Sequence, residues 1–165
     1  MCEILDKIIE TSYNTSVATA KKGDKMTTTE TTEITKHPIV DNDYYEHIGK
    51  LFGAHFTMTL EPHIYNGART LSADYCSGHW DFFSLSNGGF FMAPRSNKSF
   101  NVSCAYGEPV KMSAEGLGIA ACLFAFSQLS FGRGAFAETC GRHYHLLSEF
   151  MIEHIDAPAI LCSAD

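Results

Sequence analysis

Two pairs of residues near the middle of the chain have types that could carry out catalysis. Cys76 and His79 could form a nucleophile–base pair, and Asp74 and Asp81 could divide general acid and general base between them. Both chemistries depend on distances in space, which spacing along the chain does not fix. No nucleophile elbow, zinc-protease helix or phosphate-binding loop accompanies these residues. The simpler interpretation places Asp74 at a helix end and Asp81 at the start of a strand, so we expect no catalytic residue.

The segment 116–121 has the GxGxx(G/A) spacing of a dinucleotide-binding turn. In that motif the glycines lie directly after a strand, within a βαβ unit. Here Ser113 already has the character of a helix N-cap, so Gly116 and Gly118 would lie inside the first turns of a helix. No strand follows to complete the unit. We therefore interpret the glycines as positions of close helix packing and expect no cofactor.

Cys140, His143 and His145 are residue types that bind metal ions. On a helix the two histidines are about 200° apart around the axis, so they point to opposite faces. Cys140 and His143 alone supply half of a tetrahedral site. The sequence therefore predicts no metal site, and it favours solvent-facing or hydrogen-bonded histidines.

Apolar residues recur at helical spacing in four segments, at 44–52, 62–78, 113–131 and about 136–155. Asp41 or Asp43 can cap the first helix, and Gly53 is suited to end it. Ser113 and Glu115 are typical of a helix start. The helix that follows them is apolar nearly all round, which predicts a central position in its domain.

Between the second and third helices the pattern changes to short strands. Two aromatic runs, 80–85 and 90–93, flank the sequence Ser-Asn-Gly-Gly, which predicts a hairpin. Asn87-Gly88 suits a type I′ turn, and Gly89 suits a bulge. Residues 100–104 alternate at period two, and 110–112 form a further short strand. The fold class is therefore α+β: a small antiparallel β-meander of about four strands, 80–112, packed with flanking helices in one domain.

The aromatic strands raise a question about the two sheet faces. Phe82 and Phe83 must point in opposite directions, as must Phe90 and Phe91. Either helices cover both faces, or one aromatic strip is open to a partner.

Composition separates the chain into an arm and a domain. Of its 165 residues 45% are apolar, with 12 Phe and 7 Tyr, which is enough for a core. Threonine dominates residues 11–36, which have few large apolar side chains. We therefore expect a flexible Thr-rich arm over 1–37 and a folded domain over 38–165. Met26 is a plausible second start, and the sequence leaves both starts open, with residues 1–25 either needed or dispensable.

Net charge, the length of apolar stretches and cysteine spacing limit the classes of function that the chain can have. The net charge is −7, from 12 basic and 19 acidic residues, whereas phosphate contacts need a basic surface. Direct DNA binding is therefore not expected. The longest apolar stretch, 116–126, is shorter than the roughly 20 residues of a membrane span. The six cysteines lie at least 18 residues apart, which favours reduced thiols in a cytoplasmic protein over a disulfide scaffold: Cys2, Cys76, Cys104, Cys122, Cys140 and Cys162.

The run HWDFFSLSNGGFFMAP, residues 79–94, resembles a known signature. It is similar to the W-x-F-[FY]-x-L-S-N-G-G-F-[FY]-M-A-P hairpin of the ArdB/KlcA-type antirestriction proteins, which plasmids and other mobile elements encode. The segments 72–75, 113–119 and 142–147 agree with the same family. The resemblance covers about residues 40–160.

The resemblance implies relief of host type I restriction, without enzymatic activity, cofactor or small-molecule ligand. It implies that the partner is the type I restriction–modification enzyme, or its DNA translocation, reached by protein–protein contact. The contact residues that we expect are Asp74, Asp81, Asn87, Gly88, Gly89 and Arg95. Roles for all six in turns, caps and solvation remain an equal alternative.

Two other functions stay open at this point. The chain could be a DNA-associated accessory or regulatory protein that acts on the DNA rather than on the enzyme, although its net charge argues against this. It could also be a hydrolase that uses Cys76, His79 or the pair of aspartates.

Overall fold

The structure, a computed structural model, describes residues 33–40, 44–104 and 108–164. The compact unit within this range is Ile34–Ala164. Residues 1–32, with most of the predicted arm and the alternative start at Met26, lie outside the described residues, as do the predicted caps Asp41 and Asp43. The arm and its boundary therefore stay predictions, although Ile34 and the residues that follow it already belong to the compact unit.

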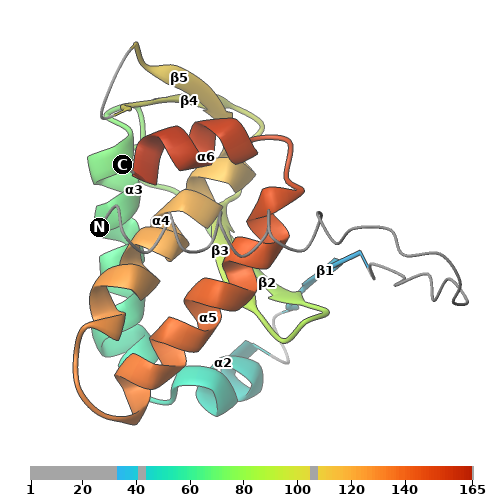
Figure 1. Cartoon of the computed structure of the whole chain (residues 1–165), viewed down its shortest axis with the longest axis vertical. Helices are drawn as coiled ribbons and strands as arrows, with labels where there is room; N and C mark the ends of the chain where they lie inside the picture. Colours follow the sequence, from blue (N-terminus) through green and yellow to red (C-terminus); the bar gives the residue numbers. More distant parts are fainter. Residues whose placement is uncertain (1–32, 41–43, 105–107, 165) are drawn as a thin grey trace, which may run out of the picture. The chain divides into compact units, whose positions relative to one another are not determined.

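The described unit begins with one short strand, which is followed by a group of helices, a group of four short strands and a last group of helices (Figure 1). Their bounds in chain order are β1 Lys36–Pro38, α2 Tyr44–Phe52, the π-helix η1 Phe56–Leu60, α3 Glu61–Leu71, β2 Trp80–Leu85, β3 Phe90–Pro94, β4 Ser99–Val102, β5 Val110–Ser113, α4 Ala114–Ser130, α5 Ala135–Ile152 and α6 Ala157–Ala164. The α+β class is confirmed. No helix of the described residues is both long and apolar enough to span a membrane.

Helix α4 is the centre of the domain, as its all-apolar sequence predicts. It packs against α3, α5, α6 and β3, and eleven of its residues are buried. Ser113 caps its start, because the Ser113 Oγ accepts a hydrogen bond from the Gly116 N–H at 3.0 Å. Gly116 and Gly118 lie in its first turns rather than before them. The packing interpretation of these glycines is thereby supported.

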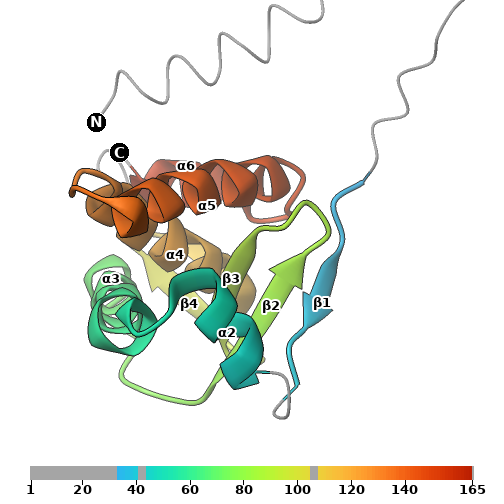
Figure 2. The same ribbon diagram turned by 90° about the horizontal axis from the view of Figure 1, so that it is seen from below.

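The strands form two sheets rather than one meander. Antiparallel strands β1, β2 and β3 make a three-stranded sheet in that order (Figure 2). Among the described residues β4 pairs with β5 in a separate two-stranded sheet (Figure 1). The free edge of β3 faces α4: the Met92 N–H lies 3.4 Å from the Cys122 Sγ. A Cβ on Gly118 would lie 2.5 Å from the Met92 carbonyl oxygen. Because the helix backbone fills this edge, β4 cannot extend the sheet there.

Strand β1 is the outer edge of the three-stranded sheet, and the sequence did not predict it. Lys36, His37 and Pro38 pair with Leu85, Ser84 and Phe83 of β2. All three residues of β1 are exposed. Lys36 and His37 lie in the segment that the sequence assigns to the arm, and Pro38 begins the predicted domain. The strand was missed because two polar residues and a proline carry no period-two pattern.

Both faces of the sheet are covered, which answers the question of the adjacent aromatics. On one face the Phe82 ring lies 4.6 Å from the Tyr44 ring of α2. On the other face the Phe83 ring stacks on Phe91 at 4.8 Å, and Phe91 stacks on Phe150 of α5 at 5.6 Å. In this part of the chain the aromatic strip is therefore packed rather than left for a partner.

One predicted helix ends earlier in the structure, and one helix of the structure was not predicted. The second ends at Leu71, not near Gly78, because Ser72 has an extended backbone and its side chain donates to the Asn101 carbonyl oxygen at 2.8 Å. Tyr75 is still buried, but it lies outside the helix and accepts a hydrogen bond from the Trp80 indole. Helix α6 was not predicted, since Pro158 suggested that helical structure ends before it.

Candidate interaction surface

The turn of the β2–β3 hairpin is not the type I′ turn that its sequence suggests. Type I′ requires positive φ at both central residues, whereas only Gly88 has it here, at 87°. The Gly88 N–H donates to the Leu85 carbonyl oxygen, and the Leu85 N–H donates to the Gly89 carbonyl oxygen, each at 2.9 Å. This is the three-residue loop in which a left-handed glycine forms the bulge. The bulge residue is thus Gly88 rather than Gly89.

Asn87 fastens this turn to helix α5. Its side-chain amide donates to the Leu146 carbonyl oxygen at 2.9 Å and to the Glu149 Oε2 at 3.1 Å. Its Oδ1 accepts the Gly89 N–H at 3.0 Å. A Cβ at Gly89 would lie 3.2 Å from the Leu146 Cβ and 2.9 Å from the Leu85 Cδ1. Asn87 and Gly89 therefore have structural roles that account for their identity.

Asp81 and Arg95 form an ion pair at the far end of the hairpin from its turn. The Arg95 Nε donates to the Asp81 Oδ1 at 2.8 Å, and Arg95 Nη2 contacts the same oxygen. The Arg95 side chain is 69% exposed and the Asp81 side chain 36%. The Arg95 N–H also donates to the His79 carbonyl oxygen, which fixes the residue after β3. Of the six expected contact residues, these two form an ion pair that is accessible to solvent.

Asp74 serves a different element. Its Oδ2 accepts hydrogen bonds from the Asn101 backbone N–H at 3.0 Å and from the Asn101 side-chain amide at 2.8 Å. These two bonds lower the pKa of the Asp74 carboxyl group. Asp74 thus ties the loop after α3 to strand β4.

The structure does not assemble the catalytic pairs suggested by residue type. Asp74 and Asp81 bind separate partners, Asn101 and Arg95. Cys76 and His79 are both exposed, and no hydrogen bond in the described part of the chain joins them. A nucleophile–base pair needs hydrogen-bond reach. Among the described residues, no group of three or more His, Cys, Asp and Glu is placed to hold a metal ion.

His143 contradicts the expectation of a solvent-facing or hydrogen-bonded histidine. It is 1% exposed, and neither ring nitrogen has a hydrogen-bond partner. Its ring lies 4.8 Å from Phe52 and 5.7 Å from Phe126. Burial lowers the pKa of His143 to about 4, so the ring is neutral at pH 7. His145, on the opposite face of α5, is exposed as predicted.

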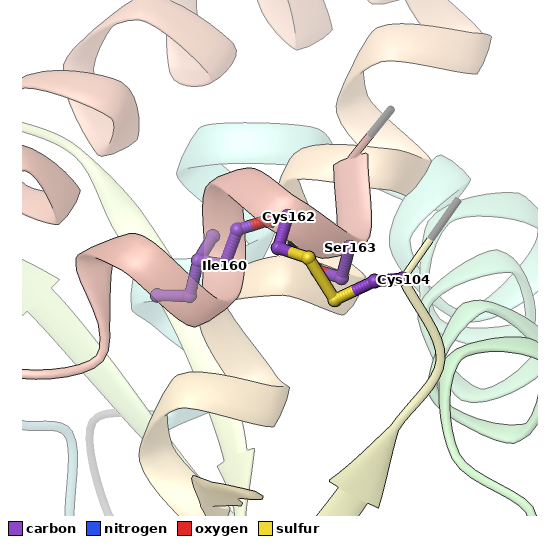
Figure 3. The surroundings of a disulfide bond; sticks show 4 residues. All are labelled: Cys104, Ile160, Cys162 and Ser163. Atoms are coloured by element: carbon purple, nitrogen blue, oxygen red, sulfur yellow. Dashed lines mark hydrogen bonds between the residues drawn. A yellow bond between two sulfur atoms is a disulfide. The ribbon is translucent and has the colours of Figure 1, made fainter. Parts of the chain in front are cut away.

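A disulfide replaces two of the predicted free thiols. Cys104, directly after β4, is bonded to Cys162 of α6 across 58 residues of sequence (Figure 3). Of the other described cysteines, Cys76 is exposed, whereas Cys122 and Cys140 are buried. Wide spacing in the sequence does not exclude a bridge, since the fold brings the end of β4 beside the last helix.

A charged cluster that the sequence analysis missed joins the start and end of the domain. Glu115, in the first turn of α4, accepts a hydrogen bond from Lys36 of β1 and lies 3.5 Å from the His154 Nε2. These groups, His154 foremost, hold the pKa of Glu115 at about 2. Asp156 accepts hydrogen bonds from the Ser113 N–H, at 3.1 Å, and from the Ser113 hydroxyl group. Only the acidic first turn of α4 signalled part of this cluster.

The chain was compared with a family model and with individual protein sequences, and both comparisons find related proteins. The sequence model described as "Antirestriction protein" matches residues 73–165. The uncharacterized protein YafX of Escherichia coli K12 is 37% identical over 135 residues, which cover 78% of this chain and 86% of YafX. An antirestriction protein KlcA of Escherichia coli is 39% identical over 98 residues, which cover 58% of this chain and 67% of that protein.

A solved structure also matches this fold. It comes from a study of the KlcA and ArdB proteins, which reports a novel fold and antirestriction activity against type I DNA restriction systems in vivo but not in vitro. The match has a TM-score of 0.73 at 29% identity, and it covers 83% of this chain and 99% of the other. Because the family model matches more than half of its length and the fold is shared, the chain belongs to the antirestriction protein family.

Proposed function

We propose that this chain relieves type I restriction in its host, by a non-catalytic contact that interferes with the restriction–modification enzyme or with its DNA translocation. The observation that carries the proposal is the structural match, because the described domain aligns with nearly the whole of a protein from the study of that activity. The proposed setting is the cytoplasm of a cell that receives unmodified DNA on a mobile element.

The arrangement of side chains favours a contact with another protein over catalysis. The residues that could act as nucleophile, acid or base are dispersed, and the two aspartates are engaged in structural bonds. The acidic balance of the whole chain, −7, opposes binding to DNA phosphates. A protein surface is therefore the partner that the chain fits best.

The contact surface that we propose centres on Asp81 and Arg95. The turn residues Asn87 and Gly89 hold the hairpin on α5, so their role is to position the hairpin rather than to touch a partner. Asp81 and Arg95 lie at its open end with exposed charged groups. Paired charges of this kind contribute to register and partner choice more than to affinity.

The function is tested by the plating efficiency of unmodified phage on a type I-restricting host. Expression of the chain should raise plating at least tenfold over the empty vector. Cleavage by the purified type I enzyme is measured beside it. Inhibition in both assays places the target on the enzyme itself, whereas relief only in cells requires a further host component. No relief from soluble protein contradicts the proposal, and salt-sensitive binding to duplex DNA would favour an action on the DNA instead.

A charge exchange tests the contact surface. In the double variant Asp81→Arg with Arg95→Asp, the two charges change places, so the internal ion pair can re-form while the pattern offered to a partner is reversed. We expect at least a tenfold loss of restriction relief, with the free energy of unfolding within about 1 kcal/mol of wild type.

The control for this exchange is another exposed ion pair. On α2 the Lys50 Nζ lies 2.6 Å from the Glu46 Oε1, and both side chains are more than two-thirds exposed. The variant Glu46→Lys with Lys50→Glu should keep full relief. Full relief by the Asp81/Arg95 exchange as well would show that this pair is not a contact.

A further inference from the structure

The disulfide joins two segments, of which the first is packed more firmly in the domain than the second. Cys104 follows β4, whose residues Phe100 and Val102 are buried in the core. Cys162 belongs to the final turns of α6, close to the end of the chain (Figure 3). The bridge therefore connects a firmly packed strand with the terminal helix.

Helix α6 has few other attachments. It is eight residues long, and helices of this length are not stable by themselves in water. Ile160 is 1% exposed and Ala157 9%, and these two are its buried side chains in the described part of the chain. Before the helix, Asp156 is bonded to Ser113. Past Ile160 no side chain that the structure describes is buried, and the disulfide is the covalent attachment of α6 to the rest of the domain.

Opening the bridge would loosen the part of the core that α6 covers, since Ile160 belongs to that core. Helix α6 packs on α4 and β5, where Met112 is 1% exposed. Leu161, the residue after Ile160, is already 40% exposed. If the last turns of α6 detach, apolar surface of α6, α4 and β5 becomes accessible together.

We propose that the Cys104–Cys162 disulfide is a reversible redox clasp on α6, which cellular dithiols open and which thereby uncovers apolar surface of α6, α4 and β5. A thiolate of the dithiol attacks one sulfur of the bridge, forms a mixed disulfide and releases the other sulfur as a thiolate, which takes up a proton. The second thiol of the reductant then displaces the remaining cysteine. The chain ends with two thiols and the reductant with one disulfide.

Among the other cysteines that the structure describes, the two buried ones do not take part in this exchange. Burial raises the pKa of the Cys122 thiol to about 12 and that of the Cys140 thiol to about 11, so neither forms the thiolate that exchange requires. Cys76 is exposed, but it lies in the loop before β2 rather than on α6. It provides a matched control.

Hydrogen exchange tests the clasp without reference to function. In the full chain, backbone amides of 157–164 should exchange at least tenfold faster after reduction with dithiothreitol, while amides of α4 keep their protection. The double variant Cys104→Ser with Cys162→Ser should exchange like the reduced protein in either buffer. Cys76→Ser should respond to reduction like wild type. Equal exchange of α6 in oxidised and reduced protein would overturn the proposal.

A second arm, which rests on the proposed function, links the clasp to activity. Wild type should relieve restriction in an ordinary host and lose at least fivefold in a host whose cytoplasm is oxidising. The double serine variant should relieve restriction equally in both hosts. If wild type and this variant respond alike to the change of host, the clasp has no part in restriction relief. Absence of relief in every strain would instead reject the proposed function, and hydrogen exchange would still decide the clasp.

Discussion

At the scale of single residues, the most unusual side chain is His143. It lies among Phe52 and Phe126 with both ring nitrogens unpaired, although a buried polar group without a partner costs stability. Burial is the main reason for its lowered pKa, and the nearby charges of Arg142 and His47 act in the same direction. Folding must therefore keep this ring neutral, which makes stability depend on pH.

Replacing His143 should remove that dependence. The folded pKa, about 4, lies below the unfolded value of 6.5. The neutral ring therefore contributes fully to the free energy of unfolding above pH 6.5. As pH falls from 6.5 to 4, this contribution is lost, which lowers the free energy of unfolding by about 3 kcal/mol at most. His143→Phe should flatten this part of the stability curve and raise stability at pH 7 by about 1 kcal/mol. Urea unfolding measured from pH 7 to 4 checks both effects.

The control for this change is on the same helix. His145 is exposed on the opposite face of α5, so His145→Phe should leave the pH profile as it is in wild type. An unchanged slope in His143→Phe between pH 6.5 and 4 would show that another group carries the dependence.

At the scale of elements, the sequence predicted the features that depend on residues close together in the chain. The start of α4 at Ser113, the end of α2 at Gly53 and the β2–β3 hairpin all follow from caps, glycines and periodicity. The pairing of β4 with β5 alone did not follow, because it depends on α4 filling the edge of β3. The same limit applies to the candidate site. Its residues could be named from sequence, but the ion pair of Asp81 with Arg95 and the structural role of Asn87 depend on contacts across the fold.

The contact of α4 with β3 gives a prediction at this scale. A Cβ at Gly118 would lie 2.5 Å from the Ala93 Cα and from the Met92 carbonyl oxygen, both of which are backbone atoms. Gly118→Ala should therefore push the helix from the strand and destabilise the domain by about 2 kcal/mol. The midpoint of urea unfolding measures this.

The matched substitution is on α2. A Cβ at Gly49 would meet nothing within 4 Å, and its backbone is helical. Gly49→Ala should stabilise the domain by about 0.5 kcal/mol, because alanine is the better helix former. A Gly118→Ala variant as stable as wild type would contradict the close approach of α4 and β3.

At the scale of the whole described domain, the charged cluster around Glu115 joins segments far apart in the sequence. Lys36 comes from β1, Glu115 from α4, and His154 from the turn between α5 and α6. The cluster thus connects the first strand with the region that leads into the last helix. Its pH response is separate from that of His143, because the pKa of Glu115 is lowered from 4.5 to about 2.

Acid titration should show the contribution of this cluster. A carboxyl group whose folded pKa is lowered contributes stability above its unfolded pKa and loses it as pH falls, here from about 4.5 to 2. Since Glu115 is partly exposed, we expect a loss of about 1–2 kcal/mol over this window. Glu115→Gln should be less stable than wild type at pH 6 and equally stable near pH 2. A constant difference across the window would exclude the ionisation of Glu115 as the cause.

The two borders of the three-stranded sheet restrict how another chain can bind. On the side of β3, α4 approaches so closely that no further strand fits. On the other side β1 has three residues, and Pro38 has no N–H to offer. Short strands with proline are how proteins block edge-to-edge association. This sheet is therefore a poor template for β-augmentation or fibril growth, and another chain can contact it through its side chains rather than through unpaired backbone.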